Sequence, residues 1–106
     1  MRILLISPKY DSYIVAPCLG LGYLASSLKK NGHVVKVMDG LREEIVYDPT
    51  DWDMVGVTAM STYFPECIQE VKKAKDFGLT TIIGGPHIIC DPIQSLIDSE
   101  ADYAAV

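Results

Sequence analysis

Strand-length apolar runs alternate with helical patterns along almost the whole chain. The first run, Arg2–Ser7, is apolar from Ile3 to Ile6 and stops at Pro8. Between residues 18 and 30, apolar side chains recur at the i, i+3, i+4 and i+7 spacing of one helix face. These side chains are Leu21, Leu24, Ala25 and Leu28. The same periodicities predict strands at His33–Met38, Asp53–Thr58, Leu79–Gly84 and from Asp102 onward, and a helix over Pro65–Phe77.

Turn-forming residues mark where the helices stop and start. Asn31-Gly32 follows the first helix and Gly78 follows the next, because glycine adopts the positive φ that ends helices. Asp91-Pro92 is typical of an N-cap and first helical residue, with Gln94 at the capping-box position. Three apolar residues of this last helix, Ile93, Leu96 and Ile97, are expected on one face. A short helix is also expected around Arg42 to Val46.

This pattern predicts an α/β fold of one domain. Near-continuous apolar strands separated by helices indicate a parallel sheet that is covered on both faces. Right-handed crossovers then favour a flavodoxin-like, five-stranded parallel sheet in the order 2-1-3-4-5. Such a fold normally carries a helix after the fifth strand, so we expect residues 1–106 to be the N-terminal part of a longer polypeptide, truncated after strand five.

Composition limits the partners and the compartment. The formal net charge of −5 disfavours a nucleic-acid or anionic membrane surface. No run is long enough to span a bilayer, and no signal peptide is recognisable, so a cytoplasmic location is expected. The three cysteines, Cys18, Cys67 and Cys90, are too widely spaced for a zinc ribbon and are expected to be small buried hydrophobes.

A ligand in such a sheet is expected beyond the carboxyl ends of the strands, where the strand order reverses. Gly84 and Gly85 would let a ligand approach the backbone closely. Ser61 and Thr62 add hydroxyls at a helix start, and Tyr10 adds a broad amphipathic surface. The alternative is that glycine, serine and threonine at strand ends are ordinary turn residues.

Other kinds of site receive less support. Neither a GxGxxG nor a P-loop pattern occurs, which disfavours a dinucleotide or P-loop site. His87 suits hydrogen bonding to a ligand or capping of the next helix better than metal binding, since no second ligand stands at metal spacing. A triad drawn from Ser61, His87 and Asp91 lacks a nucleophile elbow.

Several motifs in the same order resemble the N-terminal cobalamin (vitamin B12)-binding domain of B12-dependent radical SAM enzymes. The matching stretches begin with Ile3-Leu-Leu-Ile-Ser-Pro8, Leu19-Gly-Leu-Gly-Tyr-Leu-Ala25 and residues 30–40. They continue with residues 53–61, Tyr63-Phe-Pro-Glu66 and Ile83-Gly-Gly-Pro-His87. Together they cover nearly the whole chain.

The resemblance implies a domain that holds cobalamin against a catalytic radical SAM domain. The corrin would lie over the strand ends, and its nucleotide tail would enter the sheet's edge through a slot bounded by small residues. By position, the residues implied to line this site are Pro8, Tyr10, Ser61, Thr62, Gly84, Gly85, Pro86 and His87.

Two departures refine this implication. Methionine-synthase-type domains carry D-x-H-x-x-G in the first strand–helix loop, but residues 7–17 contain no histidine, so base-off cobalamin without a protein histidine ligand is expected. The three-cysteine motif for a [4Fe–4S] cluster is also absent from these residues. The cluster, S-adenosylmethionine and catalysis, for example methyl transfer, are therefore expected in the remainder of the parent protein.

Two further functions stay open. The chain could be a flavodoxin-like docking or regulatory domain of a radical SAM protein that does not bind B12. It could also be a small hydrolase that uses Ser61 or His87. Under the cobalamin hypothesis, a bulky residue in place of Gly85 is expected to abolish binding while leaving the fold intact.

Overall fold

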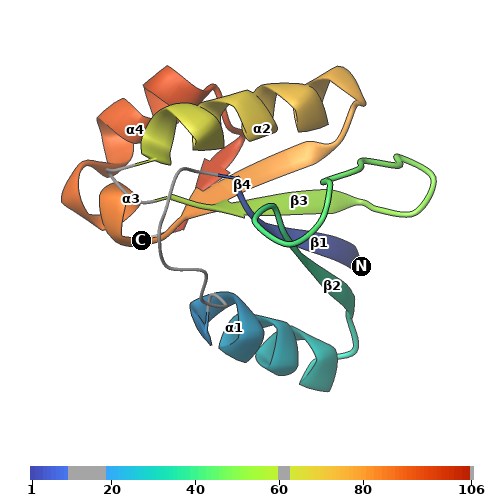
Figure 1. The fold of residues 1–106 in the computed structure, drawn as a ribbon. Helices are drawn as coiled ribbons and strands as arrows, with labels where there is room; N and C mark the ends of the chain where they lie inside the picture. The colour runs from blue at the N-terminus through green and yellow to red at the C-terminus, as the bar shows by residue number, and fades with distance from the viewer. Residues whose placement is uncertain (10–18, 60–62, 106) are drawn as a thin grey trace.

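The computed structural model describes residues 1–9, 19–59 and 63–105 (Figure 1). The strands and helices begin and end within a residue or two of the expected positions, apart from differences described below. In chain order the elements are β1 (Arg2–Ser7), α1 (Leu19–Lys30), β2 (Val34–Asp39), β3 (Met54–Thr58), α2 (Phe64–Asp76), β4 (Thr80–Gly84), α3 (Pro86–Cys90), α4 (Pro92–Ser99) and β5 (Tyr103–Ala104).

The strands form one parallel sheet in the order β2-β1-β3-β4-β5, which confirms the flavodoxin-like prediction. Ile6 pairs with Val57, and Val57 pairs with Ile83, so β1, β3 and β4 end in nearly the same row. Parallel strands place their carboxyl ends at one edge, and the order reverses between β1 and β3. The fold therefore puts the expected ligand edge at the ends of these three strands.

The two faces of the sheet are covered unequally. Leu4 and Ile6 of β1 pack in a core cluster with residues of α2 and α3, whereas Ile3 and Leu5 pack on the other face with α1. Burial on both faces explains why β1 is a continuous apolar run. Figure 1 shows α2, α3 and α4 on one side of the sheet and α1 on the other. Since α1 packs chiefly on β2 and β1, no described helix covers the α1 side of β3 and β4.

The connection between β2 and β3 contains no helix, so the helix expected around residues 42–46 is wrong. Arg42, Glu43 and Glu44 are exposed, and a helix here would bury little apolar surface. Tyr47 anchors the connection instead. Its hydroxyl donates a hydrogen bond to Glu70 Oε2 on α2, and its ring lies 6.2 Å from the ring of Phe77.

Because Tyr47 is buried as a neutral phenol, the fold should become less stable at alkaline pH. Burial raises the pKa of Tyr47 above its ordinary value, and the hydrogen bond to Glu70 raises it further. Because the folded pKa exceeds the unfolded value of about 10, this stabilisation is complete below that pH and is lost as the pH rises above it. We expect Tyr47→Phe to lower the free energy of unfolding by about 1.5–3 kcal/mol near neutral pH.

Urea unfolding of the wild type and Tyr47→Phe, near neutral pH and above about pH 10, measures both effects. The variant should lose less stability on going to alkaline pH than the wild type does. Equal losses in the two proteins would show that Tyr47 is not the group responsible.

Helix α4 starts as expected but presents a different face to the core. Asp91 Oδ1 accepts a hydrogen bond from the Gln94 backbone N–H at 3.4 Å, which confirms the N-cap. The Gln94 side chain does not return to the cap, because it donates to Asp98 Oδ1 at 2.8 Å. Leu96 packs on the core, but Ile93 and Ile97 are 76% and 63% exposed. The three residues do share one face of the helix, but this face meets the core at Leu96 alone among them, and the small side chains Ser95 and Ser99 are buried.

The described cysteines divide between core and surface. Cys67 is buried as expected, whereas Cys90 is exposed and the expectation for it is wrong; Cys18 lies outside the described residues. Burial raises the pKa of the Cys67 thiol to about 12, with a further contribution from the charge of Glu70. Because the thiolate is the reactive form, Cys67 should resist alkylation in the folded chain.

Iodoacetamide labelling of Cys18→Ser, read by mass spectrometry, measures this difference. One label at Cys90 is expected before unfolding and a second, at Cys67, only in denaturant. Labelling of Cys67 as fast as Cys90 in the native chain would contradict the burial of its thiol.

Candidate functional site

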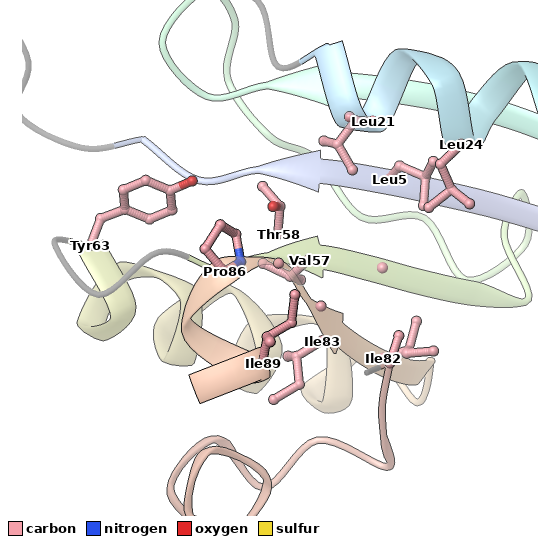
Figure 2. Close-up of a pocket in the computed structure, with 15 residues that line it drawn as sticks. Leu5, Leu21, Leu24, Val57, Thr58, Tyr63, Ile82, Ile83, Pro86 and Ile89 are labelled. Carbon is pink, nitrogen blue, oxygen red and sulfur yellow. The ribbon is translucent and has the colours of Figure 1, made fainter. Parts of the chain in front are cut away.

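An apolar cavity of about 570 Å³ opens on the α1 side of the sheet, at the carboxyl ends of β3 and β4 (Figure 2). Its volume lies within the range of small-molecule sites, roughly 300–1,000 Å³. The lining residues come from three strands (Leu5, Gly56, Val57, Thr58, Ile82, Ile83 and Gly84), from α1 (Gly20, Leu21 and Leu24), from α3 (Pro86 and Ile89), and from Tyr63, Gly85 and Ala105.

The floor of the cavity is the sheet itself, and α1 forms a wall. Leu5, Gly56 and Ile82 lie in the middle of their strands, so the cavity extends from the carboxyl edge part of the way down the sheet. Figure 2 shows Leu21 and Leu24 projecting from α1 on the side of Leu5. Gly56 has no side chain to fill the floor of the cavity. An added Cβ there would lie only 2.9 Å from Leu5 Cδ2, which is closer than real Cβ contacts. The cavity thus exists because α1 does not extend over β3 and β4.

Backbone contacts fix the rim at the end of β4. The Ala59 N–H donates to the Gly84 carbonyl at 2.7 Å, and the His87 N–H donates to the Ala59 carbonyl at 3.2 Å. Gly85 lies between them with φ +111°, a backbone conformation that L side chains rarely adopt. A Cβ on Gly85 would lie 2.7 Å from the Ala59 carbonyl oxygen. The close backbone contact between the end of β4 and Ala59, just after β3, therefore requires glycine at residue 85.

This geometry corrects the expectation that a bulky residue at Gly85 would leave the fold intact. Any side chain there meets the backbone of Ala59 and also occupies a strained φ. Gly84 is the better position for blocking the cavity, because a Cβ there lies at an ordinary 3.6 Å from Ala105 Cβ.

The residues expected in the site are only partly brought together. Gly84, Gly85 and Pro86 line the cavity. Pro8 is fully buried and does not line it. His87 also stands outside the lining, and its ring lies 4.1 Å from that of Phe64. Tyr10, Ser61 and Thr62 lie outside the described residues.

Sequence reasoning missed Thr58, Tyr63, Leu24 and Ile89. Thr58 could have been found, because it is the last residue of a strand at the expected edge. It also lies two residues after Gly56 and therefore on the same face of the sheet. The part played by Leu24 depends on how α1 lies on the sheet, and that of Ile89 depends on the unexpected helix α3. Local periodicity carries no signal for either.

The described lining of the cavity is electrically neutral. None of the described residues that line it has a charged side chain, and Thr58 and Tyr63 supply its side-chain hydroxyls. Within the described ranges, no cluster of three or more histidine, cysteine or acidic side chains could hold a metal ion. The arrangement therefore suits an uncharged, largely apolar group with few hydrogen-bonding atoms.

A second cavity, of about 620 Å³, lies between α2 and the connection after β2, and its chemistry differs. Glu66, Glu70 and Lys73 of α2 line it together with Lys9 and residues 40–45. Much of its charge is already paired, since Lys73 Nζ lies 3.5 Å from Glu70 Oε1 and Arg42 Nε lies 3.6 Å from Asp39 Oδ2. The apolar cavity is therefore the better candidate for a neutral ligand. Across the residues that the structure describes, no helix has the length and apolarity needed to cross a bilayer.

Solved structures share this fold. A radical S-adenosylmethionine methyltransferase, TsrM from Kitasatospora setae, with cobalamin and a [4Fe-4S] cluster bound, superposes with a TM-score of 0.80 at 18% identity, over 98% of this chain and 23% of that chain. A cobalamin-binding protein from Desulfitobacterium hafniense gives 0.73 at 16% identity, over 99% and 52%. The response regulator TrrA from Thermotoga maritima gives 0.58 at 17% identity, over 99% and 84%.

No protein-family model matches the sequence, and neither does any curated protein. The chain spans less than a quarter of the length of TsrM. At these identities the likeness establishes the flavodoxin-like fold, a fold present both in cobalamin-binding structures and in a response regulator.

Proposed function

We propose that this chain is a cobalamin-binding module whose apolar cavity receives the nucleotide tail of the cofactor. The observation that carries the proposal is the neutral cavity that enters the sheet from its carboxyl edge, beside Gly84 and Gly85. The corrin ring would lie outside the ends of β1, β3 and β4, where open α/β sheets bind ligands. Among the structures that share the fold, one has cobalamin bound and another is that of a cobalamin-binding protein, which supports this choice.

The residues of the cavity fit the chemistry of a nucleotide tail. Gly84 and Gly56 leave room for a planar base against the backbone, and Leu21 and Leu24 provide an apolar wall. The Thr58 hydroxyl makes no hydrogen bond to the described residues, so it is available to a polar atom of the ligand. Pro86 and Tyr63 lie at the strand-end side of the cavity (Figure 2), the side on which the corrin would lie.

We propose that further residues contribute to the site from outside the described lining. Tyr10, Ser61 and Thr62 would add contacts at the rim, as the family resemblance implies. Pro8 and His87 would pack against the residues of the rim and hold them in place, since both stand outside the lining. We also propose base-off binding without a histidine ligand, because residues 7–17 contain no histidine.

We further propose that the module belongs to a longer, cytoplasmic radical SAM protein. Bound cobalamin would supply a methyl group carried on cobalt, and the [4Fe–4S] cluster and S-adenosylmethionine would be held by the partner domain. The residues of this chain would hold and orient the cofactor, and catalysis would take place elsewhere in the parent protein.

Gel filtration of the purified chain after incubation with hydroxocobalamin tests the binding function. We expect absorbance of the corrin to co-elute with the protein in a ratio near one to one. Protein that elutes colourless at concentrations far above micromolar would contradict the proposal.

A docking or regulatory domain that does not bind B12 is the second candidate. The observation that favours it is the outward-facing pair Ile93 and Ile97 on α4, which form an apolar surface away from the cavity lining. A hydrolase that uses Ser61 or His87 has less support, because the cavity is lined by neither a carboxylate nor His87 among its described residues.

A further inference from the structure

We propose that the cavity selects among corrinoids by their lower base and prefers a benzimidazole to a purine. This inference rests on the cobalamin-binding function proposed above and names the class of corrinoid that the site accepts. Natural corrinoids share the ring and differ in the base at the end of the nucleotide tail. A site that encloses that base can therefore distinguish them.

The part of the lining that the structure describes offers very few side-chain hydrogen-bonding partners to an enclosed base. The side chains on the α1 face that line it, Leu5, Leu21, Leu24 and Ile82, present only hydrocarbon. The Gly84 carbonyl at the end of β4 already accepts the Ala59 N–H. Among the described lining residues, the polar side-chain atoms are the hydroxyls of Thr58 and Tyr63, near the carboxyl edge.

Dimethylbenzimidazole suits a lining with many apolar side chains and few hydrogen-bonding groups. Apart from the nitrogen bonded to ribose, it carries one ring nitrogen that accepts a hydrogen bond, and the Thr58 hydroxyl can donate one. Its two methyl groups suit the leucine and isoleucine walls, where burial of apolar surface is favourable.

Adenine does not match. It carries an exocyclic amine and additional ring nitrogens, and most of these would be buried against hydrocarbon without partners. Each polar group that loses water without gaining a hydrogen bond weakens binding considerably, and leaving one such group unpaired corresponds to roughly tenfold in affinity or more. The apolar lining therefore disfavours purine-containing corrinoids.

Absorbance titrations of the full 106-residue chain with three corrinoids test this inference. The probes are hydroxocobalamin, its adenine analogue pseudocobalamin, and cobinamide, which has no nucleotide tail. We expect hydroxocobalamin to bind at least tenfold more tightly than pseudocobalamin, and cobinamide to bind more weakly than hydroxocobalamin.

A matched pair of variants on α1 tests whether the cavity is responsible for the preference between the two bases. Leu24 lines the cavity yet is 46% exposed, so Leu24→Asn should fold. An asparagine amide can accept from the exocyclic amine of adenine and donate to the ring nitrogen next to it, so this variant should reduce the preference at least threefold. Tyr23 is 77% exposed and does not line the cavity, so Tyr23→Asn should leave the preference unchanged.

The outcomes separate this inference from the function on which it rests. Equal affinity for hydroxocobalamin and pseudocobalamin would overturn the selectivity and leave cobalamin binding standing. Cobinamide bound as tightly as hydroxocobalamin would show that the tail does not enter the cavity, and would overturn the inference as well. Failure to bind any of the three would overturn the proposed function and the inference together.

Discussion

Gly85→Ala is expected to lower the free energy of unfolding by about 2–5 kcal/mol, the sum of a strained backbone and a steric clash. Gly85 has φ +111°, and its added Cβ would lie 2.7 Å from the Ala59 carbonyl oxygen and 3.0 Å from the Ala59 nitrogen. The neighbour is backbone and cannot rotate away. Relief would require β3 and β4 to separate at the edge where the Ala59 N–H bonds to the Gly84 carbonyl.

Urea unfolding followed by circular dichroism measures this loss, with Gly84→Ala as the matched control. A Cβ on Gly84 meets Ala105 Cβ at 3.6 Å, an ordinary contact, so the control should change stability by less than about 1 kcal/mol. Similar stabilities for Gly85→Ala and Gly84→Ala would show that the rim does not depend on glycine at residue 85.

Gly84→Leu is expected to weaken cobalamin binding at least a hundredfold while the chain stays folded. Gly84 lines the cavity beside Thr58 and Ile83, and a leucine side chain there would extend into the space assigned to the nucleotide tail. A base that cannot enter loses its buried apolar contacts, and a hundredfold loss corresponds to about 2.7 kcal/mol. Titration with hydroxocobalamin, followed by corrin absorbance, measures the change.

Gly22→Leu is the control for this experiment. Gly22 lies on α1 with no atom within 4 Å of an added Cβ, and it does not line the cavity. The same substitution there should leave affinity within about twofold, since it touches nothing in the site. Unchanged binding by Gly84→Leu would place the ligand elsewhere on the chain.

The sheet could be predicted from sequence because each strand has its own local signal. Arg2–Ser7 is a continuous apolar run because β1 is buried on both faces, and that burial follows from parallel topology. The helix ends at residues 30 and 76 could be predicted for a similar reason, since Gly32 and Gly78 adopt φ +88° and +78° just beyond them.

The site was harder to predict because its walls come from packing between distant elements. The strand-end rule placed Gly84, Gly85 and Pro86 at the right edge. It could not show that α1 leaves β3 and β4 uncovered, and this gap is what brings Leu24 and Ile82 into one cavity. Helix α4 illustrates the same limit, because it packs with Ser95 buried and Ile93 exposed, against the apolar pattern.

The most direct test of the proposed function is methyl NMR of the isoleucine side chains during titration with hydroxocobalamin. The side chains of Ile82 and Ile89 line the cavity, whereas Ile93 and Ile97 lie on the exposed surface of α4. We expect large, saturable shifts of Ile82 and Ile89 at one equivalent of ligand, with Ile93 and Ile97 unmoved. Saturable shifts confined to Ile93 and Ile97, or no shifts at all, would contradict binding of cobalamin in the apolar cavity.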